Sequence, residues 1–319
     1  MEDTYLKSVY INVQGGLGFN IALTHVLPEI KEKFDKIFVL SPYFDVFESS
    51  KYVDCVYKPN EIHSFIFDAK SEDGLIIMNR LYDMDGFIKK ELSYSDAWRI
   101  LLGLPSKKEK GGTSLKANIE PEVKYPYLLK SAESVYQQIG NKKFILCQFW
   151  GGQSPLDLPP ANENNEPDWS KKPYDYEHEP LKRHYPVELA AQFIKLFKEA
   201  HPDVEVIMYS LPNEPSIEGA NKFTVPYLTY NVMAKNDNCV GIVSIDSSLP
   251  HMTAGIKPAV VIWGHSLPQS FGYSYNNNII QHCNRDDILY FSALGPSGNR
   301  IDYIKPEDLL KSVNETLFH

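Results

Sequence analysis

Residues 9–20, VYINVQGGLGFN, set the pattern that the rest of the chain follows. Val9 to Val13 is a short β-branched and aromatic run, which is typical of a buried strand. The glycines between residues 15 and 18 allow a tight turn in which the backbone can approach a ligand closely. From Ile21 to Phe34 the apolar residues return at helical spacing. This stretch therefore predicts a strand, a glycine turn and a helix.

Further apolar runs continue the alternation of strands and helices. The predicted strands lie at 37–40, 53–57, 75–78, 144–149, 204–209, 240–245 and 259–263. Stretches with helical spacing lie at 95–104, 128–139, 187–200, 227–235 and 306–317. Strands that alternate with helices favour a parallel sheet with helices on both faces. The predicted fold class is therefore α/β.

The strand-and-turn pattern restarts near residue 140, which indicates a second α/β domain. The run 144–149, FILCQF, is followed by Trp150-Gly151-Gly152, a second strand with a glycine turn. We expect a first domain over residues 1–125 and a second over residues 126–319, with packing of the C-terminal helix back on the first domain left open. The polar stretch 106–126 between them is typical of a linker or an exposed loop.

Charge and composition narrow the class of protein. The 319 residues include 32 Lys and Arg and 41 Asp and Glu, which gives a net charge of −9. A strongly basic nucleic-acid coat is therefore not expected, although a local basic cleft is compatible with this charge. The cysteines form no CxxC pair, so we expect reduced thiols and no zinc ribbon at Cys55, Cys147, Cys239 and Cys283. No secretory signal or membrane-length apolar run is visible, so the expected location is the cytoplasm, or the host cytoplasm for a viral protein.

Glycine and polar residues follow several predicted strands. Ligands of open α/β sheets bind beyond the carboxyl ends of the strands, so these residues are the candidates for a binding site. They are Gly16, Gly18, Gly151, Gly152, Gln153, Tyr209, Asn213, Asp246, Ser247, Ser248 and His251. Lys182 and Arg183 lie near the end of the long polar stretch 153–185, which is typical of an active-site loop or a disordered insertion.

The stretch from Ser244 to His251 carries the clearest chemistry. Asp246 would cap a helix, and the amides of Ser247 and Ser248 would point outward from its positive end. Hydroxyls, amides and an imidazole at one strand end suit a phosphate or a sugar. The alternative is a plain helix cap beside a partly buried histidine.

Two weaker elements also favour an anionic ligand. Lys182 and Arg183 precede Tyr185-Pro186 and would clamp a diphosphate, because an arginine makes two-pronged contacts. The alternative for this pair is a solvated entrance to the helix 187–200. The GGLG turn is neither a full dinucleotide fingerprint nor a phosphate-binding P-loop, and its alternative is a tight turn without a ligand.

These residues together resemble the ADP-heptose:lipopolysaccharide heptosyltransferases, glycosyltransferase family 9. The stretch 244–264, SIDSSLPHMTAGIKPAVVIWG, is similar to that family's D-[ST]-x-x-x-H-x-x-A-x-x-x-P-x-V-x-x-x-G block, which matches Asp246, Ser247, His251, Ala254, Pro258, Val260 and Gly264. Arg183-His184-Tyr185-Pro186 resembles the family's basic-x-Trp-Pro element, and residues 15–18 resemble its G-x-x-G turn. The layout also looks like a divergent bacteriophage branch in which QGGLG, FxGGQSP, LKRHYP and IDSSLxH occur together.

The resemblance implies a GT-B fold, in which two Rossmann-like domains face a central cleft, and transfer without a catalytic metal. It implies a nucleotide-diphosphate sugar as donor substrate, held by the C-terminal domain, and no separate cofactor. The residues that would contact its phosphates and sugar are Asp246, Ser247, His251 and Arg183, with Lys182 as a neighbour. The N-terminal domain would hold the acceptor, which is a glycan or, given the phage-like layout, a hydroxylated base in DNA.

One position departs from the family pattern. The family usually carries an Asp directly after the G-x-x-G turn as the proposed general base, whereas this chain has Phe19 followed by Asn20. Neither side chain takes up a proton at neutral pH. The candidates to replace that catalytic residue in the N-terminal half are Asp85, His25, Asp83 and Asp96.

Other functions stay open at this point. Loss of the family base suits a non-catalytic protein that binds a nucleotide or a sugar. A sugar epimerase shares the two-domain architecture but needs paired acid and base residues, which we do not identify in the sequence. If the acceptor is DNA, the candidate phosphate contacts are Lys89, Lys90, Arg99, Lys107, Lys108 and Lys110.

Overall fold

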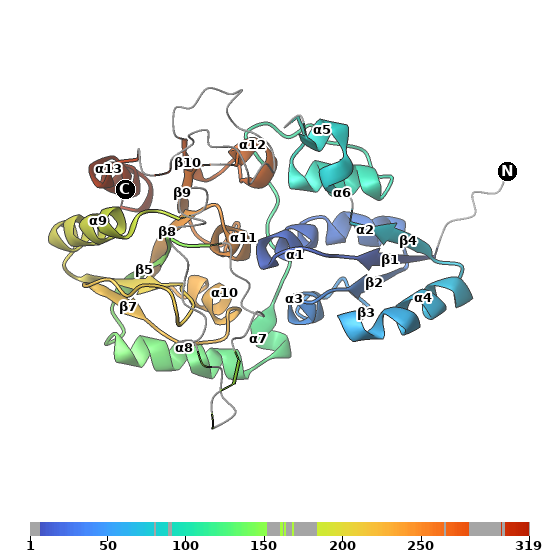
Figure 1. The fold of residues 1–319 in the computed structure, drawn as a ribbon, viewed down its shortest axis with the longest axis horizontal. Helices are drawn as coiled ribbons and strands as arrows, with labels where there is room; N and C mark the ends of the chain where they lie inside the picture. Colours follow the sequence, from blue (N-terminus) through green and yellow to red (C-terminus); the bar gives the residue numbers. More distant parts are fainter. Residues whose placement is uncertain are drawn as a thin grey trace. The chain divides into compact units, whose positions relative to one another are not determined.

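The computed structural model describes residues 7–79, 81–88, 91–151, 160–161, 163, 168, 184–264, 266–280, 301 and 304–318. The chain forms two compact units (Figure 1). The first comprises Met1–Leu128 and Gln269–Ser274, and the second comprises Leu129–Pro268 and Tyr275–His319. The chain therefore leaves the second unit at residue 268 and returns to it at residue 275.

The first unit is built on a four-stranded sheet whose strands all run parallel. In the order β3-β2-β1-β4, they are β3 (Cys55–Tyr57), β2 (Lys36–Leu40), β1 (Ser8–Asn12) and β4 (Leu75–Met78). β1 lies between β2 and β4, and all of its residues are buried. A strand covered on both faces needs a continuous apolar run, which is why the sequence predicts it well.

Helices cover both faces of this sheet, and Figure 1 shows α2 and α4 on opposite sides of it. Phe65 of α4 packs edge-on against the rings of Tyr10 in β1 and Tyr57 in β3. The helical segments of the unit are α1 (Leu17–Thr24), α2 (Leu27–Lys33), α3 (Phe44–Glu48), η1 (Pro59–Glu61), α4 (Ile62–Ser71), η2 (Leu81–Asp83), α5 (Asp85–Ile88), α6 (Tyr94–Leu101) and α7 (Pro121–Lys124).

The single helix predicted over residues 21–34 is wrong, because the structure divides it. α1 begins directly at the glycine turn and ends at Thr24, and α2 begins at Leu27. Pro28 lies in the first turn of α2, where its missing N–H is not needed. The same residue could not continue α1, because proline cannot donate the hydrogen bond of a helix interior.

The second unit is built on a six-stranded parallel sheet. In the order β10-β9-β8-β5-β6-β7, its strands are β10 (Asn277–Ile280), β9 (Ala259–Trp263), β8 (Cys239–Ile245), β5 (Lys143–Gln148), β6 (Val204–Met208) and β7 (Ala220–Lys222). The remaining helices of the chain are α8 (Tyr127–Gln138), α9 (Val187–Ala200), α10 (Thr229–Ala234), α11 (Ser248–Met252), α12 (Pro268–Phe271) and α13 (Pro306–Leu317). Two parallel sheets with flanking helices confirm the predicted α/β class.

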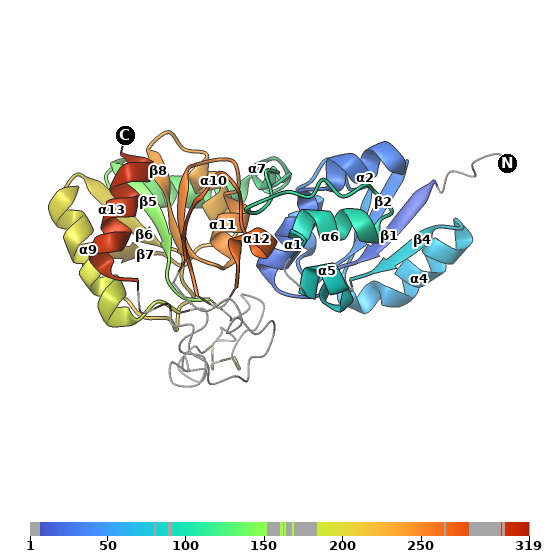
Figure 2. The ribbon, with the colours of Figure 1, turned by 90° about the horizontal axis from the view of Figure 1, so that it is seen from above.

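The core of the second unit lies between its sheet and the helices on both faces. α9 and α13 cover one face (Figure 2), where Phe193 and Val313 join Ile145 in one buried cluster. α8 covers the other face, where the ring of Tyr136 stacks on Phe144. The C-terminal helix α13 packs on α9 within the second unit.

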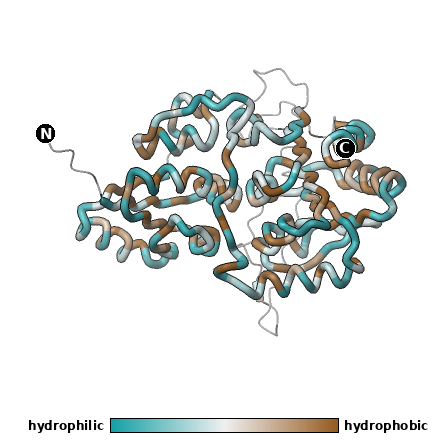
Figure 3. Tube along the Cα trace, turned by 180° about the vertical axis from the view of Figure 1, so that it is seen from behind, coloured by the Kyte–Doolittle hydropathy of each residue, from teal (hydrophilic) through white to brown (hydrophobic). Residues whose placement is uncertain are grey.

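Hydrophobic segments follow the strands inside each unit, and hydrophilic residues alternate with them along the outer helices (Figure 3). This distribution agrees with burial, since β8 and β9 consist almost entirely of buried residues. Within the part of the chain that the structure describes, no helix is both long and apolar enough to cross a membrane.

The segment that returns to the first unit is fixed there by hydrogen bonds. Gln269 Nε2 donates to the Glu109 carbonyl at 2.8 Å. The Thr113 N–H donates to the Gly272 carbonyl at 2.9 Å, and the Thr113 carbonyl accepts from the Ser274 N–H at 3.0 Å. A distant part of the chain therefore completes the first unit.

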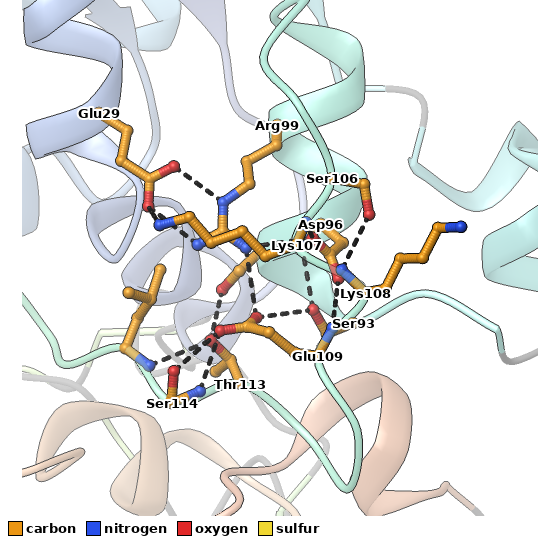
Figure 4. A network of polar contacts seen from close by, with 12 residues as sticks. Glu29, Ser93, Asp96, Arg99, Ser106, Lys107, Lys108, Glu109, Thr113 and Ser114 are labelled. Atoms are coloured by element: carbon orange, nitrogen blue, oxygen red, sulfur yellow. Dashed lines mark hydrogen bonds and ion pairs between the residues drawn. The ribbon is translucent and has the colours of Figure 1, made fainter.

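Arg99 of α6 is the centre of a polar network (Figure 4). Its side chain is 0% exposed and contacts the carboxylates of Glu29 at 2.8 Å, Asp96 at 3.1 Å and Glu109 at 3.3 Å. Asp96 also accepts the Lys107 N–H at 2.7 Å and the Glu109 N–H at 3.1 Å. These contacts hold the start of the stretch 106–126 against α6, so it is a fixed loop and not a linker. Lys107, Lys108 and Lys110 are exposed, as the alternative of an exposed loop predicts.

The network keeps the carboxylates of Glu29 and Asp96 ionised. Hydrogen bonds from Arg99 lower the pKa of Glu29 to about 2. Burial alone would raise the pKa of Asp96, but the N–H groups of Lys107 and Glu109 and the Arg99 guanidinium outweigh burial and lower it. Because Arg99 is enclosed by these groups, its expected contact with a DNA phosphate is wrong.

Replacing Arg99 with leucine is expected to reduce the free energy of unfolding by about 3–5 kcal/mol, because buried carboxylates then lose their cation. Urea unfolding followed by circular dichroism measures this change. Lys36→Leu is the matched control, because the Lys36–Glu72 pair is exposed to solvent and its loss should change the stability little. If the two substitutions lowered the free energy of unfolding equally, the Arg99 network would contribute no more to stability than an exposed ion pair.

Candidate functional site

The order of the six-stranded sheet brings several strand-end loops together. β5 lies between β6 and β8, and the three strands run parallel, so their carboxyl ends share one edge. The register aligns Gln148 of β5 with Ser244 of β8, and Cys147 with Met208 of β6. We refer to the residues beyond this edge as the strand-end site: Gly151, Tyr209, Asp246, Ser247 and Ser248.

Gln148 joins the end of β5 to the start of α11. Its Oε1 accepts the Leu249 N–H at 3.0 Å, and both groups are buried. Beside this contact, a Cβ added to Gly151 would lie 2.8 Å from Ser247 Oγ and 3.2 Å from Ser247 Cβ. Glycine at position 151 therefore lets the loops after β5 and β8 approach each other closely.

Asp246 is held in place by a neighbouring loop. Its carboxylate accepts a hydrogen bond from the Ser266 hydroxyl, and the residue is 8% exposed. Ser247 and Ser248 beside it are partly exposed, whereas His251 is buried. The turn therefore presents two serine hydroxyls next to a fixed carboxylate.

The start of α11 offers fewer amide donors than the sequence analysis expects. The N-cap is Ser247 and has no side-chain cap hydrogen bond, so the prediction that Asp246 caps this helix is wrong. Pro250 has no N–H, and the Leu249 N–H is taken by Gln148. In a helix of five residues the hydroxyls and the carboxylate, rather than a helix dipole, are the main polar features.

Tyr209 follows β6 and reaches the same group of residues. The Ser248 hydroxyl donates to Tyr209 Oη at 3.4 Å. The rings of Tyr209 and Tyr230 lie 4.6 Å apart, and the Tyr230 hydroxyl donates to the Met208 carbonyl at 3.1 Å. The structure thus brings Tyr209 and Ser248 together, and Asn213 lies farther along the same loop, partly exposed.

Two charged residues in this region have roles that were not predicted from the sequence. Glu214 is 6% exposed, and its Oε2 accepts the Leu211 N–H at 2.7 Å. Lys222 Nζ donates to the Pro212 carbonyl at 3.1 Å and to the Glu214 carbonyl at 2.5 Å. The two side chains hold the loop after β6 in shape. Only burial and contacts reveal this role, since an acid in a proline-containing loop is ordinary in a sequence.

Burial makes the Glu214 carboxyl group a weaker acid than an exposed glutamate. Removal from water raises the pKa of its carboxyl group to about 7, although the Leu211 N–H and the Lys222 charge both act to lower it. Burial also lowers the pKa of the Lys222 ammonium, and Glu214 opposes that change. A carboxyl group at the end of β6 is therefore close to half protonated near neutral pH.

Four of the predicted donor residues, Gly152, Gln153, Lys182 and Arg183, lie outside the described residues. The described chain resumes at His184, which forms an isolated β-bridge with Trp150. The Tyr185 N–H donates to the Phe149 carbonyl at 2.8 Å. The residue that follows Arg183 in the sequence therefore lies beside the carboxyl end of β5.

The glycine turn of the first unit lies beyond β1. Gly15 has a φ of +113°, which residues with a side chain rarely adopt. Asn20 Nδ2 donates to the Gly15 carbonyl at 3.2 Å and to the Gly16 carbonyl at 3.0 Å, and its Oδ1 accepts from Ser41 Oγ at 2.6 Å. Gly16 is the N-cap of α1, and Gly18 lies in its first turn. Asn20 therefore ties the turn to the end of β2.

Phe19, at the position where the resembled family carries its base, points into the core of the first unit. It is 5% exposed, and its ring lies 5.1 Å from Tyr94 and 5.8 Å from Trp98 of α6. This position serves the packing of α1 on α6. Proton transfer at this turn would need a group from another segment.

The candidate bases differ in exposure. His25 is 2% exposed at the end of α1, and its Nε2 lies 3.1 Å from the Tyr273 hydroxyl, so this enclosed ring is poorly placed to reach a substrate. Asp96 is enclosed in the Arg99 network. Asp83 and Asp85 are exposed and follow β4, which neighbours β1 in the sheet. Of the two catalytic candidates, Asp85 therefore fits that role better than His25.

The described residues contain no group of three or more His, Cys, Asp or Glu that could hold a metal ion. Cys55, Cys147 and Cys239 are free thiols, and Cys283 lies outside the described residues.

The fold of the chain is similar to that of solved family 9 glycosyltransferases. The glycosyl transferase family 9 protein from Veillonella parvula DSM 2008 matches with a TM-score of 0.66 at 13% identity, covering 100% of this chain and 99% of that one. E. coli ADP-heptose lps heptosyltransferase II matches with a TM-score of 0.58 at 10% identity, covering 98% of each chain. E. coli heptosyltransferase WaaC with ADP matches with a TM-score of 0.52 at 10% identity, covering 97% of each chain.

These matches extend over the whole chain and confirm the predicted fold: two Rossmann-like units of the GT-B type. No protein-family model matches the chain, and no curated protein matches it either.

Glu214→Gln is expected to stabilise the protein above neutral pH. The folded state holds the Glu214 proton up to about pH 7, whereas the unfolded chain releases it near its ordinary pKa of 4.5. Stability in the wild type therefore falls as pH rises from about 4.5 to 7, by about 3 kcal/mol at most. Urea unfolding at pH 5 and pH 8 should show a larger advantage of the variant at pH 8. If the stability difference between the variant and the wild type were the same at pH 5 and pH 8, the raised pKa of Glu214 would be contradicted.

Proposed function

We propose that the protein is a glycosyltransferase whose second unit holds a nucleotide-diphosphate sugar at the strand-end site. The observation that carries the proposal is the convergence of Gly151, Tyr209 and the stretch 246–248 at one sheet edge. The likeness in fold to heptosyltransferases supports it, since one of these is named for ADP-heptose and another was solved with ADP. In open parallel sheets this edge is where nucleotides bind.

The proposed roles of the donor residues follow from their chemistry. The Ser247 hydroxyl donates a hydrogen bond to the donor, and Ser248 Oγ, whose proton is directed to Tyr209 Oη, accepts one from it. Asp246, fixed by Ser266, accepts from a hydroxyl of its sugar or ribose. Lys182 and Arg183 supply positive charge for the diphosphate. This assignment is supported by the position of His184 beside β5.

The proposed reaction is a direct displacement. An acceptor hydroxyl forms a bond to the anomeric carbon of the sugar, the bond to the diphosphate oxygen breaks, and the acceptor proton passes to a base. Negative charge grows on the leaving diphosphate, so cationic and hydroxyl groups accelerate the step, each by about 10²–10³ in known sites. We assign the base to Asp85, because it is exposed and follows the strand beside the glycine turn.

The acceptor is proposed to be a hydroxylated molecule, either a glycan or a modified base in DNA. The enclosed position of Arg99 removes one of the candidate phosphate contacts and so favours the glycan. A second candidate function is non-catalytic binding of a nucleotide sugar. The burial of Phe19 in an aromatic cluster favours it, because the turn then has no base of its own.

Asp246→Asn and Arg183→Ala are each expected to lower glycosyl transfer by about 10²-fold or more, because each removes a group that binds or stabilises the donor. The assay is release of nucleoside diphosphate from a panel of UDP- and ADP-sugars, with and without glycan acceptors. Asp237→Ala, an exposed acid of the same unit, is the matched control and should keep full activity. Wild-type rates in both site variants at saturating donor would disprove the site.

Asp85→Asn is expected to lower the rate of transfer by about 10²–10⁴-fold while donor affinity stays unchanged, because only proton removal is affected. Asp35→Asn, at an exposed acid of the same unit that is not a candidate base, is the control and should have a small effect. Single-turnover kinetics with calorimetric donor binding separates the two quantities. Donor binding without turnover in the wild type, with acceptors supplied, would instead support the non-catalytic binder.

A further inference from the structure

A hollow of about 580 Å³ lies in the second unit, between α8 and the stretch that follows β7. Both walls belong to this unit, and none of the residues of the strand-end site lines the hollow. It is lined by Lys130, Ser131, Ser134, Val135, Gln138, Lys222, Phe223, Thr224, Val225 and Pro226.

The lining is cationic in a protein of net charge −9. Two of the described lining residues are lysines and none is an acid. Glu133, on the same helix, is not part of the lining. A second hollow, of about 680 Å³ beside α9, shows the contrast, because its lysines Lys195 and Lys198 are accompanied by Glu199 and Glu218. Of these two hollows, the one at α8 concentrates one sign of charge.

Hydroxyl and amide groups complete this lining. Lys130, Ser134 and Gln138 are four residues apart on α8, so they share one helix face. Ser131 lies beside them, and Thr224 lies on the opposite wall. Ammonium and hydroxyl donors arranged around a space are the groups that bind phosphate oxygens.

Lys222 links this hollow to the loop after β6. Two of the three hydrogens of its ammonium group are directed to the Pro212 and Glu214 carbonyls. Burial disfavours its charge, and the carboxyl group that acts on it, Glu214, itself resists ionisation. A bound anion would satisfy the remaining hydrogen and stabilise the charge. The same ammonium group binds two carbonyls of the loop. A ligand in the hollow would therefore change the stability of the loop at residues 210–214.

We propose that this hollow binds a small molecule carrying a phosphate group, and that Lys222 transmits its occupancy to the loop at the end of β6. The binding step is independent of the proposed glycosyl transfer, and it adds a second ligand site to the unit. The shared chemistry is a phosphate dianion, supplied either by inorganic phosphate or by a phosphorylated metabolite.

Isothermal titration of the full-length protein tests the binding step. The probes are inorganic phosphate, glucose 6-phosphate and AMP at constant ionic strength, and tighter binding of one organic probe identifies the phosphorylated metabolite as the source. Lys130→Ala is expected to weaken binding by about tenfold or more, because it removes a charged donor. Lys195→Ala removes the same charge from the contrasting hollow and should bind like the wild type. Equal affinities of Lys130→Ala and wild type would overturn the proposal.

Ser247→Ala separates this site from the donor site, because it removes a hydroxyl donor from the strand-end site. If phosphate binds in the hollow, this variant keeps the wild-type affinity. If Ser247→Ala weakens phosphate binding and Lys130→Ala does not, the anion occupies the strand-end site, which overturns the present inference and leaves the proposed function standing. Hydrogen exchange tests the transmission step: phosphate should slow exchange in residues 210–214 of the wild type and not of Lys130→Ala, and unchanged exchange in the wild type would overturn that step.

Discussion

The hydrogen bond from the Leu249 N–H to Gln148 Oε1 joins residues 101 positions apart, and the strand-end site depends on it. A parallel sheet places the loops after β5, β6 and β8 on one edge, but it does not fix their side chains. The Gln148 contact brings α11 to the end of β5, where only a glycine at position 151 leaves room for Ser247. Ser248 then reaches Tyr209, so three strand ends become one polar surface prepared before any ligand binds.

Much of the fold could be predicted because buried parallel strands and amphipathic helices leave local patterns. The strands at 75–78 and 259–263 and the helices at 187–200 and 306–317 have the predicted bounds. Contacts between distant segments could not be predicted in this way. The stretch 106–126 is polar and looks like a linker, yet its acid and backbone groups serve Arg99 and Asp96. The partners of these groups lie in α6, and the spacing of residues within 106–126 does not predict them.

The candidate site shows the same contrast between features that follow from local sequence patterns and features that depend on contacts between distant segments. Strand-end position alone identified Asp246, Ser248 and Tyr209, and the structure brings these residues together. Their individual roles needed contacts: Asp246 pairs with Ser266 and does not cap a helix. No role was predicted for Glu214 and Lys222, because the burial that shifts their pKa values cannot be read from the sequence. The enclosed positions of Phe19 and His25 likewise follow from the packing of α1, and this packing moves the search for a base to Asp85.

The central claim is that the strand-end site binds a nucleoside diphosphate. The most direct measurement is hydrogen exchange of the backbone amides, followed by mass spectrometry, with ADP or UDP added to the full-length protein. The account predicts slower exchange in residues 209–214 and 246–251 when the nucleotide binds, with little change in the Arg99 network. Binding of either nucleotide by calorimetry with unchanged exchange in both stretches would contradict it.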